Sequence, residues 1–214
     1  MTVGTAQLDL AMQAAAAAVP VAVYFLILGL LNSRPHPQLL RARRDFAILV
    51  GALCPLFVLP AVAWAGTSPA ALAALAAAGA AAVAVLAPPR RSWVVYNVTA
   101  HQALRAVEEA LRAAAIPHRR DGQTFRLDEG RAGLTLAPFP LLRNVSLRLQ
   151  GDRGGDLAGR FERAMARRLE TIPVETAPMT MALLLVATGM LAAPLALMAP
   201  RVPEIVRLIG GILP

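Results

Sequence analysis

The sequence has little that points to chemistry. Among its 214 residues there is no lysine, a single cysteine (Cys54) and only 16% charged residues. One cysteine excludes an intramolecular disulfide and a cysteine-based metal site. The histidines (His36, His101 and His118) have no acidic partner at ligand spacing, and no Gly-rich phosphate loop or nucleophile-elbow motif occurs. We therefore predict no catalytic residue, no bound cofactor and no metal site.

Charge is also missing from a long stretch of the chain. No Asp, Glu, Arg or Lys occurs between Phe46 and Pro89, a run of 44 residues. One helix of that length would extend about 66 Å, whereas the hydrocarbon core of a bilayer is about 30 Å thick. The run must therefore fold back on itself, and the Gly-Thr-Ser-Pro sequence at residues 66–69 is typical of a turn. We expect residues 46–89 to form a helical hairpin that crosses a membrane twice.

Two further uncharged runs predict two more membrane spans. The first, from Leu10 to Ser33, lies mostly within an N-terminal segment of residues 1–31, and its length and lack of early positive charge argue against a signal peptide. The second occupies residues 176–200. The tail that follows, residues 201–214, is too short to cross and suits an amphipathic helix at the membrane interface or against a partner. With 57% apolar residues, the fold class expected is membrane α-helical, with four transmembrane helices.

Residues 90–175 have the composition of an ordinary small α+β domain. The segment Trp93–Val98 is rich in β-forming residues, and Thr99 with Gln102 has the pattern of a capping box that starts a helix. Three alternating apolar and polar stretches and a closing amphipathic helix follow. The expected order is β-α-β-β-β-α, with both helices on one face of an antiparallel sheet. Their apolar faces are predicted to consist of Leu104, Val107, Leu111 and Ala114 in one helix, and Leu157, Phe161, Met165 and Leu169 in the other.

The distribution of arginine predicts the orientation. All 21 basic residues are arginine, which together with abundant alanine is typical of a GC-rich genome. The connection at residues 32–45 holds four arginines, and Arg90 and Arg91 follow the hairpin, whereas the hairpin turn and the N-terminal tail have none. Because arginine-rich loops stay inside, we expect a bacterial cytoplasmic (inner) membrane protein. Its connection and its 90–175 domain would be cytoplasmic, and both termini would lie outside.

Two groups of residues are candidate contact sites. Each basic residue near an anionic membrane surface adds about 1 kcal/mol of attraction, although a basic helix face can equally be solvated and offset by Glu162 and Glu170. The candidate contacts for anionic lipid or a partner are Arg41, Arg43, Arg44, Arg90, Arg91, Arg160, Arg163, Arg167 and Arg168.

The second group is a candidate helix-packing face. The second arm of the hairpin is almost pure alanine, which is barely hydrophobic enough to insert alone, and small residues permit close helix packing in membranes. The alternative is an alanine-rich span that reflects only genome composition. The candidate packing residues are Ala73, Ala76, Gly79 and Ala80.

The predicted spans contain no ionisable residue, which argues against an ion pathway or proton relay within this chain. The leading hypothesis is a non-catalytic membrane subunit that anchors, scaffolds or stabilises a larger protein complex, with the α+β domain docking a partner. Two alternatives are a membrane-tethered sensor that binds a ligand or anionic lipid, and a lipid-handling enzyme or transporter component that uses, for instance, His36 with Arg41, Arg43 and Arg44. The domain order after Thr99 matches the outline of a double-stranded-RNA-binding domain. The 15 arginines and 10 acidic residues between Pro88 and Glu175 give a net charge of only +5, so we do not expect nucleic acid as a partner.

Overall fold

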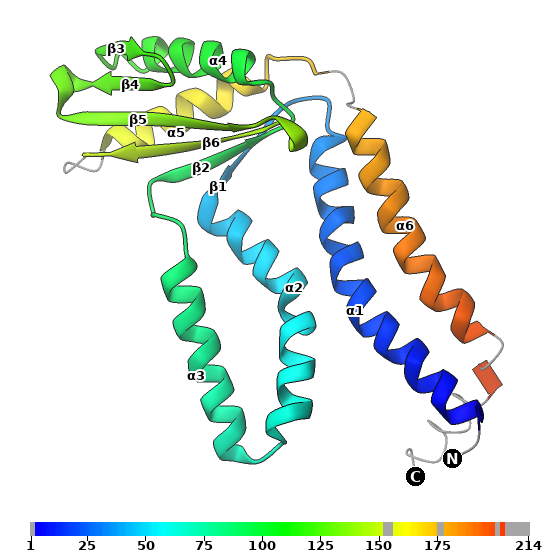
Figure 1. Ribbon diagram of the computed structural model, residues 1–214. Helices are drawn as coiled ribbons and strands as arrows, with labels where there is room; N and C mark the ends of the chain where they lie inside the picture. Colours follow the sequence, from blue (N-terminus) through cyan, green and yellow to red (C-terminus); the bar gives the residue numbers. More distant parts are fainter. Residues whose placement is uncertain (1–2, 152–155, 175–177, 200–201, 204–214) are drawn as a thin grey trace.

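The computed structural model describes residues 3–151, 156–174, 178–199 and 202–203. It is mostly helical, with a small antiparallel sheet domain at one end of four long helices (Figure 1). Each of these helices contains a segment long and apolar enough to cross a membrane, which is consistent with the predicted helical membrane fold with a small α+β domain. Most of the predicted tail, residues 201–214, lies outside the described residues. The long helices are α1 (Val3–Asn32), α2 (Ala42–Ala65), α3 (Pro69–Leu86) and α6 (Pro178–Met198).

The predicted hairpin turn is confirmed between α2 and α3. Gly66 has a φ of +82°, in the left-handed region where glycine is favoured, and its N–H donates to the carbonyl oxygen of Val62 to close α2. The Ser68 hydroxyl accepts a 3.2 Å hydrogen bond from the N–H of Ala71, and Pro69 occupies the first turn of α3. Turn chemistry alone therefore reverses the chain here.

The other two long helices, α1 and α6, lie side by side and run in opposite directions (Figure 1). A Cβ atom added at Gly29 would lie 2.6 Å from Cδ2 of Leu184, so a larger residue there would require the Leu184 side chain to move. At the domain end of the pair, the Thr180 hydroxyl donates to the carbonyl oxygen of Asn32 over 3.3 Å. These contacts make α1 and α6 the most closely packed pair of helices.

The sheet has six antiparallel strands in the order β1-β2-β6-β5-β4-β3. Helices α4 (Ala100–Ala113) and α5 (Asp156–Leu169) cover one of its faces, as predicted (Figure 1). The edge strand β1 lies nearest the long helices, and β3 is the edge farthest from them (Figure 1). The strands are β1 (Gln38–Arg41), β2 (Ser92–Tyr96), β3 (His118–Asp121), β4 (Thr124–Leu127), β5 (Ala132–Phe139) and β6 (Asn144–Gln150).

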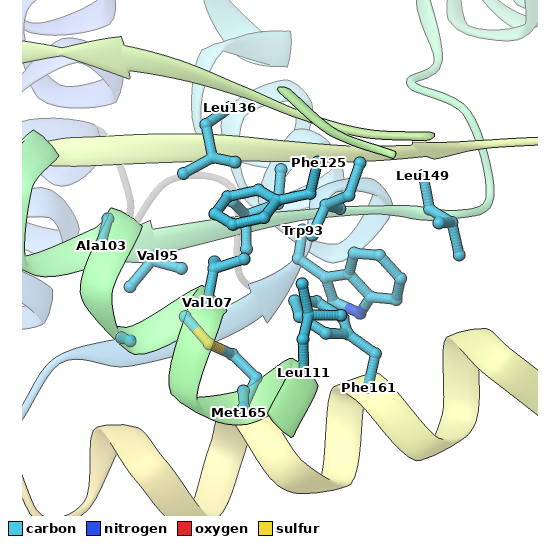
Figure 2. Close-up of a cluster of buried hydrophobic side chains, with 14 of the residues drawn as sticks. Trp93, Val95, Ala103, Val107, Leu111, Phe125, Leu136, Leu149, Phe161 and Met165 are labelled. Carbon is cyan, nitrogen blue, oxygen red and sulfur yellow. The ribbon is translucent and has the colours of Figure 1, made fainter. Parts of the chain in front are cut away.

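The domain core fills the space between the sheet and the two covering helices (Figure 2). The apolar positions of the predicted strands are buried here, and the predicted apolar faces of both helices pack against them. The capping box at the start of α4 is also confirmed, because the Thr99 hydroxyl accepts from the N–H of Gln102 and the Gln102 side chain accepts from the N–H of Thr99. The sequence pattern therefore predicted this core correctly.

The predicted element order β-α-β-β-β-α is wrong because it lacks two strands. One is β3, an edge strand of four residues, all polar or charged, which shows no apolar alternation. Its sequence signal is Gly122, which has a φ of +62° and together with Gln123 makes the two-residue turn to β4. The other is β1, which lies within the connection at residues 32–45 and pairs with β2. A four-residue strand between two membrane spans is too short for its pattern to stand out.

We expect Phe161→Ala to destabilise the domain strongly. The Phe161 side chain is 1% exposed and its ring centroid lies 5.5 Å from that of Trp93 in an edge-to-face arrangement. Truncating a fully buried phenylalanine costs about 3–5 kcal/mol. Thermal unfolding of the purified protein in mild detergent, followed by circular dichroism, measures the change. The control is Arg105→Ala on the exposed side of α4, expected within about 0.5 kcal/mol of the parent.

Candidate functional site

A hydrogen bond between the side chains of Tyr96 and Asp45 joins the domain to the long helices. Tyr96 ends β2 and is 2% exposed, and its hydroxyl donates a 2.5 Å hydrogen bond to Oδ1 of Asp45 in the first turn of α2. Burial, followed by the neighbouring carboxylate, raises the pKa of Tyr96 far above its ordinary value. Tyr96 therefore remains a neutral donor at physiological pH.

An apolar cluster surrounds this hydrogen bond on the sheet face opposite α4 and α5. It brings α1, α2 and α6 together against strands β1 and β2, so three of the four long helices meet the sheet at one place. We call it the junction cluster. Its buried members are Leu28, Ala42, Val94, Tyr96 and Leu183, with Tyr24, Phe25, Leu31, Leu40 and Leu142 packed around them.

Further hydrogen bonds bind the connection that contains β1 to the domain. Buried Asn97 donates from Nδ2 to the carbonyl oxygen of Arg34 over 2.9 Å. Arg41 donates from Nε and Nη2 to the two carboxylate oxygens of Glu162 on α5, at 2.9 and 3.0 Å. On the other side of the connection, the N–H of Val174 donates to the carbonyl oxygen of Pro35. The segment between α1 and α2 is thus held along most of its length.

The predicted contact arginines before and after the hairpin come together at its domain end. Arg43 and Arg44 lie in the first turn of α2, and Nε of Arg43 donates to the carbonyl oxygen of Pro88 beyond the end of α3. Arg90 and Arg91 follow Pro88 directly before β2. The two arms of the hairpin therefore present their basic residues at the same end, next to the sheet.

The predicted basic side of α5 divides into two groups. Nη2 of Arg160 donates to the carbonyl oxygens of Ala114 and Ala115 at the end of α4, and Arg168 pairs with Glu109 on α4. These two arginines join α5 to α4. The exposed Arg163 and Arg167 form no ion pair among the described residues, so they remain the members available to lipid or a partner.

The predicted packing face of α3 has no neighbour in the described part of the chain. Ala73, Ala76, Gly79 and Ala80 are all exposed. A Cβ atom added at Gly79 would meet no other atom within 4 Å. Contact between this face and another helix remains a prediction.

Polar chemistry elsewhere in the domain is sparse. Among the described residues, no group of three His, Cys, Asp or Glu side chains is placed to hold a metal ion. Nδ1 of His36 lies 3.2 Å from the carbonyl oxygen of Ile172, while Arg41 is paired with Glu162, so these two side chains are directed to different partners. A hollow of about 240 Å³ lies between α4 and the end of α5, and its polar lining is His101, Gln102, Arg105, Glu109, Arg168 and Thr171.

The junction was missed at the level of sequence, although its parts were visible. In the sequence, Asp45 is only one of the charged residues of the connection at residues 32–45, and Tyr96 is one residue of a β-rich stretch. Only the pairing of β1 with β2 brings the start of α2 next to Tyr96. Comparison with known proteins adds no assignment, because no protein family, curated protein or solved structure matches the chain.

We expect Tyr96→Phe to weaken the attachment of the domain. It removes the donor from a partly buried carboxylate, and a hydrogen bond to a charged group contributes about 1.5–3 kcal/mol. A thermal double-mutant cycle with Asp45→Ala should show a coupling free energy of about 0.5–3 kcal/mol. Additive effects of the two substitutions would contradict a direct interaction. Tyr24→Phe is the matched control, since the Tyr24 side chain also lies in the junction cluster and makes no hydrogen bond to any of the described residues.

Tyr96 also predicts a loss of stability at high pH. An unfolded tyrosine loses its proton near pH 10, whereas folded Tyr96 retains its proton to higher pH because its pKa is raised. Unfolding therefore releases a proton above about pH 10, and the free energy of unfolding falls as the pH rises further. Unfolding of the parent and of Tyr96→Phe should be compared between neutral pH and pH 11. A pH dependence identical in the two proteins would count against the assignment.

Proposed function

We propose that the chain is a non-catalytic subunit of a larger membrane protein assembly. Its long helices anchor the assembly, and its α+β domain docks a partner. The observation that carries this proposal is the state of α3. Ala71 and Leu75 are half-buried, and every other residue of this helix is exposed. An alanine-rich span of this kind gains most from a neighbouring helix that packs closely against it.

The attachment of the domain supports an anchoring role. All four long helices lead into or out of the domain, and the junction cluster packs three of them against the sheet. The domain is thereby held at a fixed orientation to the membrane helices, as a docking platform requires. A domain on a single flexible linker would lack this constraint.

One face of the sheet is available for docking. Beyond β2, the face opposite α4 and α5 carries exposed side chains from three adjacent strands. Two are basic, Arg126 on β4 and Arg148 on β6. Thr135 lies on β5, the strand between them, and Ser146 lies on β6, the strand next to β2 and the junction cluster. The exposed polar and basic character of this face suits a partner that carries acidic side chains.

The orientation proposed from the arginines fits the arrangement of the helices. The start of α1 and the turn at residues 66–68 lie at the opposite end of the long helices from the domain (Figure 1). Arg34, Arg41, Arg43 and Arg44 lie at the domain end, where the positive-inside rule places the cytoplasm. We propose a bacterial cytoplasmic membrane, with the domain inside.

A ligand-binding sensor is the second candidate, favoured by the hollow between α4 and α5. Arg105, Arg168 and His101 line it, so an anionic ligand would suit its chemistry. This candidate requires the full chain for its test, because a segment starting at Ser92 would lack strand β1. Thermal stabilisation of the full chain by inorganic phosphate, lost in Arg105→Ala, would favour it over the subunit.

Cross-linking in native membranes tests the subunit proposal. A photoreactive amino acid at Ala76, on the exposed face of α3, should give a cross-link to another polypeptide. The same group at half-buried Ala71 is the control and should give a much lower yield. Native mass spectrometry of gently solubilised material should show the corresponding complex. Recovery of a free monomer, together with no cross-link from Ala76, would reject the proposal.

A further inference from the structure

The end of β5 and the loop that follows it carry two large apolar side chains that the fold leaves uncovered. Phe139 is 50% exposed and Leu141 is 70% exposed. Phe139 directly precedes the short 3₁₀ turn η2 (Pro140–Leu142), Leu141 lies within it, and Arg143 follows in the left-handed conformation with a φ of 46°. Neighbouring exposed apolar side chains commonly mark a contact surface.

The position of this loop is fixed by the residue next to Leu141. Leu142 packs on the junction cluster, in which Leu28 belongs to α1 and Leu183 to α6. Both of those residues lie within the apolar segments long enough to cross a membrane. Leu28 precedes the end of α1 by four residues, which corresponds to about 6 Å along the helix. The loop therefore lies at the level where the spans leave the membrane, beside the domain end of α1 (Figure 1).

Backbone hydrogen bonds hold the loop in this position. The N–H of Val98 donates to the carbonyl oxygen of Arg143 over 2.8 Å, and the preceding Asn97 binds the carbonyl oxygen of Arg34. Because Asn97 and Val98 are adjacent in the chain, their hydrogen bonds hold the loop close to the end of α1. The exposed Arg34 side chain comes from this end of α1, where an interfacial cation would meet lipid phosphates.

We propose that Phe139 and Leu141 insert into the boundary between headgroups and acyl chains of the leaflet on the domain's side. Apolar side chains gain free energy at that depth, whereas their exposure to water is unfavourable. The loop would give the domain a direct contact with lipid, continuous with the surface of α1 and α6. This inference rests on the membrane spans alone and does not depend on membership of an assembly.

Spin-label accessibility in the full chain tests the insertion. In a Cys54→Ser background, which removes the only cysteine, a label is attached through Leu141→Cys and the protein is reconstituted in vesicles of phosphatidylethanolamine and phosphatidylglycerol. Relaxation of the label by oxygen, which partitions into lipid, is compared with relaxation by a water-soluble nickel chelate. We expect the oxygen-to-nickel ratio at 141 to be several-fold higher than at a water-exposed reference.

Two reference positions calibrate the measurement. Gln123→Cys lies in the exposed turn between β3 and β4 at the far edge of the sheet, and Ala78→Cys lies on the exposed surface near the middle of α3. The label at 141 should give a ratio between these two. A ratio equal to that at 123 would overturn the proposal by placing the loop in water. A label shielded from both reagents would also overturn it, by showing that protein covers the loop. Phe139→Cys provides a second, independent labelling position.

Discussion

The pairing of β1 with β2 is the constraint on which the arrangement of this protein depends. Without β1, the outer edge of β2 would present unpaired N–H and C=O groups, which sheets avoid. The strand that satisfies them is only four residues long and lies between α1 and α2. Both helices must therefore end at the sheet edge. Because α3 leads into β2 after a short connection, the hairpin is drawn to the same edge.

The same strand separates two apolar clusters. Its adjacent residues alternate between the faces of the sheet, so Leu39 packs on the domain core and Leu40 packs on the junction cluster. Two polar contacts reinforce the position of β1. Arg41, its last residue, binds Glu162 on α5, and Asp45, which follows in the first turn of α2, binds Tyr96 on β2. A displacement of α1 or α2 must therefore displace the sheet. The junction cluster and these polar contacts link α1, α2 and α6 directly to the sheet.

The membrane helices themselves are packed unequally. Gly29 lets α1 and α6 approach closely, while α3 leaves its small residues exposed. In a lipid environment, apolar surface alone does not drive helices together, and close packing of small residues contributes instead. Under the proposed function, the alanine-rich face of α3 is the surface that packs against a second polypeptide. The uncovered sheet face offers a separate, polar surface on the domain.

The sequence by itself determined the four long helices, the turn between α2 and α3, and the core of the domain. These features depend on local patterns. They are uncharged runs long enough to span a bilayer, a Gly-Thr-Ser-Pro turn, the Thr99 capping box, and the alternation of apolar residues such as Phe125 and Leu127 with polar ones. Each pattern is long enough or chemically specific enough to be recognised from one continuous stretch of sequence.

Only the tertiary structure decided where the domain meets the membrane helices. β1 carries too few residues for its alternation to be distinguished from a loop, and β3 is a charged edge strand without an apolar face. Asp45 and Tyr96 are separated by 51 residues, so nothing local to either residue indicates their hydrogen bond. The position of the Phe139–Leu142 loop likewise depends on Leu142 reaching a cluster built from α1 and α6. Long-range strand pairing fixes such contacts, and a pattern confined to one segment cannot encode them.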